Sequence, residues 1–160
     1  MAQLWVNLPA AKKMTAPKYQ PILNSSIPVL EIPGGSVRVI AGDLHGTAGA
    51  ATTHTPLNLW DITLEGRLEL AIPASHKTAM ILSRDGHIRV DGQKVGPQSL
   101  AILSSEGAKL VLEPEGAAKA LVLTGEPIDE PIVHQGPFCM NTREEIQQAN
   151  IDYQSGRFGT

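Results

Sequence analysis

The sequence predicts an all-β domain, an antiparallel sandwich or barrel, that ends in one short helix. The first observation is the distribution of turn-forming residues. The 15 glycines and 12 prolines are scattered over 160 residues, as is typical of short strands joined by turns. The second is the spacing of the apolar runs, which recur roughly every ten residues between turn signals. The third is a helix-start signal at Thr142.

The strands are predicted from the middle of the chain. Leu68, Leu70 and Ile72 alternate with Glu69 and Ala71, which predicts a strand with one buried face and one face exposed to solvent. Tight turns are expected where Asp-Gly pairs tolerate a positive φ, at 85–86 and 91–92. Further apolar runs lie at 78–83, 88–90, 100–103, 110–112 and 121–123.

Two glycine-containing stretches precede these strands. Gly34-Gly35 is too short to cradle a phosphate and predicts a β-turn or bulge. Residues 42–55 are rich in Gly, Ala and Thr, and they are interpreted either as an ordered surface loop, which loop-length statistics favour, or as a flexible lid.

The C-terminal helix is predicted over about 142–154. Thr142 at the N-cap and Glu145 three residues later fit a capping box, and Gly156 supplies a stop. The apolar stripe of this helix consists of Ile146, Ala149 and Tyr153. Such a stripe must be covered by another apolar surface.

Composition excludes several classes of protein. Hydrophobic residues make up 42% and charged residues 18%, so the chain is not disordered. The net charge of −3 gives no reason to expect nucleic acid or a membrane as the main partner. The single cysteine, Cys139, suits a reducing compartment, and no signal peptide or long apolar span is visible. A cytoplasmic location is therefore expected.

Three segments resemble signatures of the pirin family. QLWVNLP at 3–9 is similar to the segment that joins the family's two domains, and THTPLNLWD at 53–61 is similar to a motif of its second domain. The tail GPFCMNTREEIQQA at 136–149, with Asp152-Tyr153 and GRFG at 156–159, resembles its C-terminal signature. The segments occur in the family's order and span almost the whole chain.

The resemblance implies a cupin-type jelly-roll β-barrel with a short C-terminal helix. Pirins are bicupins, whose iron is held in the first barrel by three histidines and a glutamate; bacterial members can act as quercetin 2,3-dioxygenases, and the human protein is a nuclear transcription cofactor. Only the second half is matched here, so those ligands have no positions in this sequence. We expect one domain, with a linker or N-terminal strand over 1–30, the barrel over 31–126 and a C-terminal segment over 127–160.

We expect no metal or other cofactor in this chain. In an ungapped cupin placement His54 takes the first ligand position and Asp61 that of the carboxylate, but Pro56 and Ile102 fall on the others. Proline and isoleucine offer no lone pair, so His54 and Asp61 are weak candidates at most. The plainer interpretation is that His54 ends a loop and Asp61 hydrogen-bonds to a neighbouring backbone group.

Other chemistry is not supported either. The histidines show no HxH or HxxxH pair, and they are interpreted as turn, loop or solvated residues: His45, His76, His87 and His134. Cys139 lies between Phe138 and Met140, which predicts a packed and inert thiol. Trp5 and Trp60 are interpreted as core or interface anchors, or alternatively as platforms for a flavonoid ring.

Two functions remain open. The first is a metal-free binding or structural module that pairs with a metal-bearing cupin half, an unrelated protein or a second copy of itself. Its interface is expected to consist of Leu4, Trp5, Val6, Ile146 and Tyr153, the first three on an edge strand buried on both sides. The second is a part of a quercetin 2,3-dioxygenase-type enzyme that needs such a half for its iron. In the competing monomeric arrangement, the helix covers its own barrel.

Overall fold

The computed structural model describes residues 2–158, which form two compact units. The sheet unit spans Pro21–Pro127. The terminal unit combines residues 2–20 with residues 128–158. The sheet unit begins earlier than the predicted boundary at residue 31, because the first strand already starts at Val29. Each unit has its own hydrophobic cluster.

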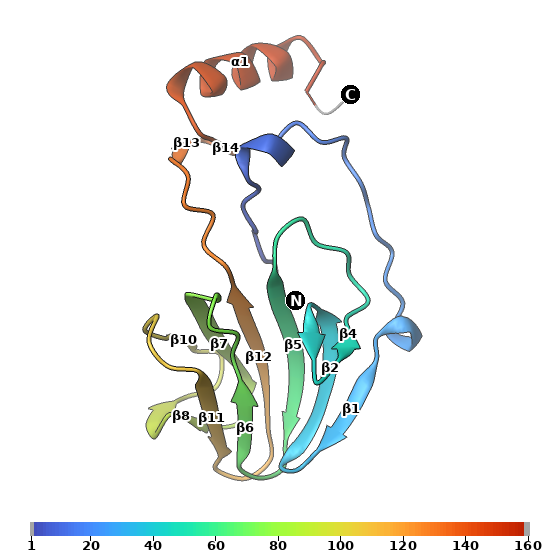
Figure 1. Ribbon diagram of the computed structural model, residues 1–160, viewed down its shortest axis with the longest axis vertical. Coiled ribbons are helices and arrows are strands. Elements are labelled where there is room, and N and C mark those ends of the chain that lie inside the picture. Colours follow the sequence, from blue (N-terminus) through green and yellow to red (C-terminus); the bar gives the residue numbers. More distant parts are fainter. Residues whose placement is uncertain (1, 159–160) are drawn as a thin grey trace. The chain divides into compact units, whose positions relative to one another are not determined.

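The sheet unit contains two antiparallel sheets (Figure 1). The six-stranded sheet has the order β1 (Val29–Ile32), β2 (Gly35–Ala41), β5 (Leu57–Leu64), β12 (Ala118–Gly125), β7 (Thr78–Asp85) and β10 (Leu100–Ile102). The four-stranded sheet has the order β6 (Leu68–Ala71), β11 (Lys109–Pro114), β8 (Ile88–Val90) and β9 (Gln93–Val95). The predicted mostly-β fold is confirmed, and it agrees with a cupin jelly roll.

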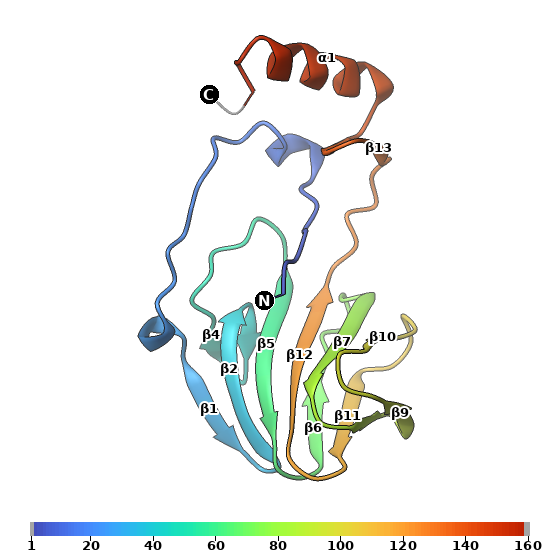
Figure 2. The ribbon, with the colours of Figure 1, turned by 180° about the vertical axis from the view of Figure 1, so that it is seen from behind.

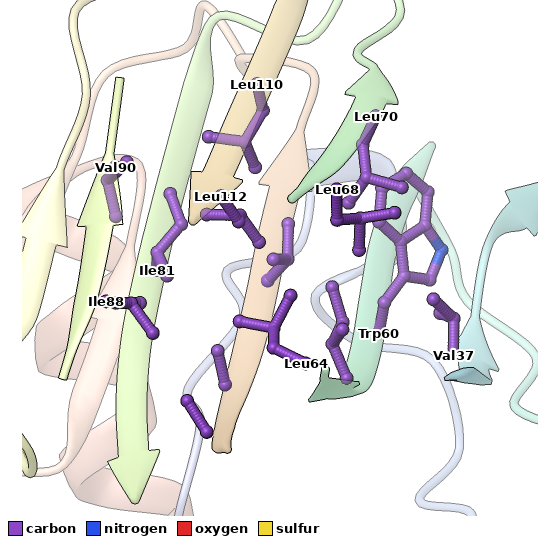
Figure 3. Close-up of a cluster of buried hydrophobic side chains, with 14 of the residues drawn as sticks. Val37, Trp60, Leu64, Leu68, Leu70, Ile81, Ile88, Val90, Leu110 and Leu112 are labelled. Carbon is purple, nitrogen blue, oxygen red and sulfur yellow. The ribbon is translucent and has the colours of Figure 1, made fainter. Parts of the chain in front are cut away.

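The core lies between these sheets, where alternate residues of each strand point inward. Figure 3 shows Val37, Trp60 and Leu64 from the larger sheet close to Leu68 and Leu70 from the smaller one. In β6 the buried residues are Leu68 and Leu70 while the residues between them are exposed, as their alternation predicts. Trp60 is therefore a core residue.

The turns follow local backbone chemistry. Asp91 and Gly92 join β8 to β9 with φ of 48° and 83°, the positive values that a two-residue hairpin turn requires. Gly34 lies in the turn between β1 and β2, also as predicted. Residues 42–55 include the short hairpin β3 (Asp43–Leu44) and β4 (Thr47–Ala48). Because Leu44 of this hairpin is buried in the core, the segment is an ordered loop.

The terminal unit consists of the 3-10 turn η1 (Ala10–Lys12), the hairpin β13 (Val133–Gln135) with β14 (Phe138–Met140), and the helix α1 (Arg143–Gln154) (Figure 1). The side-chain oxygen of Thr142 accepts from the Glu145 N–H at 3.1 Å, and the Glu145 carboxylate accepts from the Thr142 N–H at 3.0 Å. The predicted capping box is thus confirmed. Gly156 has a φ of 73°, as a helix stop requires.

The predicted edge strand near the N-terminus is absent, because residues 2–9 form no strand. Leu4, Trp5 and Val6 are consecutive apolar residues without the alternation of a strand. Pro9, which has no N–H to donate, follows them. Within residues 2–158, no helix is both long and apolar enough to cross a membrane.

Candidate functional site

Asp61 lies on the outer face of β5, between the inward-pointing Trp60 and Ile62. Its Oδ2 lies 2.8 Å from Arg38 Nη1 of β2, and its Oδ1 lies 2.5 Å from Arg84 Nη1 of β7. Its side chain is only 13% exposed. The expected bond of Asp61 to a neighbouring backbone is corrected, because both of its carboxylate oxygens are engaged by guanidinium groups. These groups compete with any metal.

The other positions of the cupin placement do not complete a metal site. His54 lies exposed in the loop before β5, and Ile102 lies on β10 with its side chain 73% exposed and pointing away from the core. Within residues 2–158 no three His, Cys, Asp or Glu side chains converge as metal ligands would. The donor set thus does not fit the three-histidine, one-glutamate iron site that the family implies.

The outer face of the six-stranded sheet carries a continuous apolar patch, which we call the apolar sheet face. One row across the strands is Leu59, Leu123, Met80 and Ile102. The next row contains Leu121, Leu82 and Leu100. Neighbours in such rows lie about 4.5–5.5 Å apart, so these seven side chains form one surface.

The apolar sheet face has a charged border. Its second row continues from Leu121 to Asp61 and then to Arg38. Because β12 lies between β5 and β7, the ion pair of Arg84 with Asp61 spans β12 and covers Leu121. The border thus resembles the polar rim of an interface around its apolar centre.

This face was not predicted, although a signal exists in the sequence. The runs at 100–103 and 121–123 are apolar without interruption. Uninterrupted apolar runs are typical of strands that are covered on both faces. Leu123 and Leu100 are therefore the kind of residue that a second sheet or a partner covers.

The predicted interface residues fall into two groups in the terminal unit. Trp5, Val6 and Tyr153 line one apolar groove of about 570 Å³, together with Phe138 and other residues. Trp5 is 73% exposed, and Leu4 is also exposed but does not line this groove. The structure therefore brings together three of the five predicted residues.

Ile146 is the exception, because it is 2% exposed and belongs to the cluster of Phe138, Met140 and Ala149. It is not available to a partner, and the prediction for this residue is corrected. The hairpin β13–β14 has three residues in each strand and covers only part of α1. Tyr153, two turns further along the helix, touches Phe138 edge-on at a ring distance of 5.9 Å and otherwise stays exposed.

The remaining candidates have structural roles. The Cys139 thiol lies 3.4 Å from Asn7 Oδ1 and is half-buried, as a packed thiol would be. His45 lies in the turn of the β3–β4 hairpin, and His87 and His134 are exposed. His76 closes a turn as interpreted, since its N–H donates to the Pro73 carbonyl at 2.9 Å. In addition, its Nδ1 lies 2.7 Å from the buried Thr124 Oγ1. Nothing in the local sequence pattern links these two residues.

Comparison with known proteins identifies the fold and the family. Residues 59–159 match the model of the pirin C-terminal cupin domain. A protein of Pseudomonas aeruginosa named "Putative quercetin 2,3-dioxygenase" is 43% identical over 162 residues, which cover 99% of this chain and 56% of that protein. Human pirin is 35% identical over 164 residues, covering 98% of this chain and 56% of its own length.

A solved structure agrees with these matches. The crystal structure of quercetin 2,3-dioxygenase from Acinetobacter baumannii superposes with a TM-score of 0.89 at 43% identity, covering 98% of this chain and 56% of that chain. The present chain therefore spans about half the length of the relatives that it matches. With the C-terminal cupin signature over 59–159 and the two-sheet architecture, the chain belongs to the pirin family.

Proposed function

We propose that this chain is a protein-binding cupin module that docks through its apolar sheet face onto a metal-bearing cupin half. The observation that carries the proposal is the run of apolar side chains in two adjacent rows of the six-stranded sheet. Leu100 and Ile102 are exposed, Leu121 is buried, and the other four are half-buried. Monomeric proteins rarely leave such continuous patches in contact with water. We further propose a cytoplasmic location, where the single cysteine, Cys139, would stay reduced.

The energetics favour a protein partner over an isolated chain. Leu100 is 53% exposed and Ile102 73% exposed at the β10 end of the patch. Burying a large apolar side chain contributes about 1.5–3 kcal/mol. Several such residues together offset an association cost of about 4–15 kcal/mol. Asp61, Arg38 and Arg84 would surround that contact with a charged rim.

The length of the relatives supports a cupin half as the partner. Human pirin and the Acinetobacter baumannii enzyme each have about as much chain outside the matched region as within it. A second barrel would present a sheet of similar size and curvature, and two sheets pack face to face through apolar side chains.

The test is binding between this chain and the unmatched portion of the Acinetobacter baumannii enzyme, produced as a separate polypeptide whose folding is checked by circular dichroism. Calorimetry should give a Kd in the micromolar range or tighter, and Ile102→Lys should weaken binding at least tenfold. Val111→Lys is the matched control, because Val111 lies on the outer face of the four-stranded sheet. Equal effects of the two variants, or no binding of the folded half, would overturn the proposal.

A second candidate function is a part of a quercetin 2,3-dioxygenase-type oxygenase. It is favoured by the names of the Pseudomonas aeruginosa and Acinetobacter baumannii relatives. Because two arginines engage Asp61 and His54 lies in an exposed loop, we infer that any such activity would depend on the other half for its iron. Oxygen uptake with quercetin and added iron should not exceed a metal-only blank for this chain alone. Turnover that is lost on denaturing the chain would assign the activity to it directly.

A further inference from the structure

A cavity of about 420 Å³ lies between the two sheets and is lined in part by their edge strands β9 and β10. Figure 2 shows these two strands on the same side of the sheet unit. Ile102, which ends one row of the apolar sheet face, also lines this cavity. Its apolar walls come from both sheets and include Ile72, Ala79, Val90, Val95, Leu103 and Leu110. A cavity of this size and lining is typical of sites for small organic molecules.

A buried chain of hydrogen bonds leads to His76 in the wall of this cavity. The backbone N–H of Asp43 donates to Asn58 Oδ1 at 3.1 Å. Asn58 Nδ2 donates to Thr124 Oγ1 at 3.1 Å, and Thr124 Oγ1 lies 2.7 Å from His76 Nδ1. Asn58 and Thr124 are 5% and 4% exposed, so their polar atoms depend on these partners.

The chain of bonds has one consistent direction. A backbone N–H can only donate, so the oxygen of the Asn58 amide faces Asp43 and its NH₂ group faces Thr124. Thr124 Oγ1 therefore accepts one bond and has its own proton left to donate. If His76 Nδ1 also donated to it, that buried hydroxyl proton would have no acceptor among residues 2–158, at a cost of about 1–3 kcal/mol. Donation from Thr124 to Nδ1 avoids this cost.

His76 is then a neutral imidazole with its proton on Nε2. Among residues 2–158, the hydrogen bond found for the His76 ring is the one between Nδ1 and Thr124, which leaves Nε2 for a ligand. Burial lowers the pKa of His76 below its ordinary value of 6.5, and the opposing effect of Glu126 is smaller. The neutral form that the bond direction requires is therefore also the form that burial favours.

We propose that this cavity binds a small neutral aromatic or alicyclic carbonyl compound, whose oxygen accepts a hydrogen bond from His76 Nε2–H. The charges at the mouth disfavour an anion. Asp91 and Glu106 contribute two carboxylates, whereas the ammonium group of Lys109 already lies 2.7 Å from Glu69. The apolar walls accept the hydrocarbon part of the ligand, and His76 supplies a fixed donor within them.

The experiment uses ¹⁵N-histidine-labelled protein and two probes of nearly equal size, 4-chromanone and its carbonyl-free analogue chroman. Nitrogen–proton correlation spectra at pH 7.5 should assign His76 to the Nε2–H form. Addition of 4-chromanone should shift His76 Nε2 and the amides of the cavity walls. The Kd for 4-chromanone should be about five- to tenfold lower than that for chroman, as one hydrogen bond would give.

Two variants keep the proposal falsifiable. His76→Leu should abolish the preference for the ketone, and Thr124→Val should reduce it while allowing the Nδ1–H form to appear. His87→Leu, outside the cavity on the same unit, should change neither. An Nδ1–H form of His76 in the unmodified protein, equal affinities for the two probes, or no shift of cavity residues at millimolar probe would each overturn the proposal.

Discussion

At the scale of single residues, Asp61 shows how one carboxylate fixes the arrangement of three strands. Its carboxylate binds Arg38 of β2 and Arg84 of β7, and in the sheet Asp61 of β5 lies opposite Arg38 of β2 and Leu121 of β12. The two ion pairs lie on the sheet surface around Leu121, and the carboxylate is mostly shielded from water. Removal of its charge would leave two guanidinium groups facing each other.

We therefore expect Asp61→Asn to lower the free energy of unfolding by about 1–3 kcal/mol, the range for bonds to charged groups. Urea denaturation followed by tryptophan fluorescence measures this change. Glu113→Gln is the control, because Glu113 lies 3.6 Å from Arg67 and is well exposed; its change should stay below about 1 kcal/mol. Equal losses for both variants would contradict this role of Asp61.

The protonation of His76 predicts a pH dependence of stability. Burial lowers its pKa in the folded chain from 6.5, with Glu126 acting in the opposite direction. Below pH 6.5 the unfolded chain then binds the proton more readily, so the free energy of unfolding is highest above that pH and falls as the pH drops. His76→Gln should make the free energy of unfolding, measured by urea denaturation, less dependent on pH between 7 and 5. His87→Gln should leave this pH dependence unchanged. An equally steep curve in His76→Gln would contradict this.

The metal content of the chain tests His54 and Asp61, the two weak candidates for metal ligands. We expect protein purified without added metal to hold no stoichiometric iron, copper, nickel or zinc, because arginines engage Asp61 and His54 lies in an exposed loop. Elemental analysis by mass spectrometry makes the measurement. About one metal ion per chain, lost in His54→Ala, would show that these two residues form a site after all. Weak zinc binding at high concentration would not count, since imidazole and carboxylate both accept zinc.

At the scale of elements, the β1–β2 turn depends on a close approach of two backbones. Gly34 has a φ of 93°, and a Cβ on it would lie 2.3 Å from the carbonyl oxygen of Arg67. Gly116 has nearly the same φ of 94°, but a Cβ there would meet nothing within 4 Å. Alanine substitutions at these two positions therefore distinguish the cost of a positive φ, which both share, from the cost of a steric collision, which only Gly34 has.

We expect Gly34→Ala to cost at least about 1–2 kcal/mol more than Gly116→Ala in the free energy of unfolding. Both variants incur the penalty of a positive φ, of about 1–3 kcal/mol. Only the first must also displace a backbone carbonyl. Thermal and urea unfolding of the pair measure the difference. Equal costs would show that the turn can shift away from Arg67 freely.

The elements that could be predicted are those specified by local chemistry. The strand at 68–71, the Asp91-Gly92 turn and the capped helix each depend on neighbours within a few residues. The apolar sheet face depends instead on register between strands far apart, such as Leu59 with Leu123. The link of His76 with Thr124 spans 48 residues and likewise has no local signal.

Ile146 illustrates why the interface prediction was only partly successful. Seven-residue spacing correctly placed Ile146 and Tyr153 on one helical stripe. It could not show that Ile146 packs into the cluster with Phe138 and Met140, whereas Tyr153 meets only the ring of Phe138 edge-on and stays exposed. Which residue of the stripe remains accessible depends on these tertiary contacts and not on the pattern of the helix.

At the scale of the whole molecule, both units present apolar surface to solvent. The sheet unit exposes Leu100 and Ile102 on the apolar sheet face, and the terminal unit exposes Trp5 and Tyr153 around its groove. The net charge of only −3 provides little long-range repulsion between copies. We therefore expect the isolated chain to associate with itself.

The expected result is a concentration-dependent rise above the 17.0 kDa monomer mass in light scattering, over a micromolar to millimolar series. The paired variant Leu100→Lys with Ile102→Lys should return the chain to a monomer if the apolar sheet face carries the contact, because two charges would have to be desolvated in it. Trp5→Ala with Tyr153→Ala tests the groove of the terminal unit in the same way. Val111→Lys controls for added charge, since it lies on the outer face of the other sheet. A strict monomer of the unmodified chain throughout the series would show that neither surface drives self-association, and the apolar sheet face would then have to be tested with the cupin half alone.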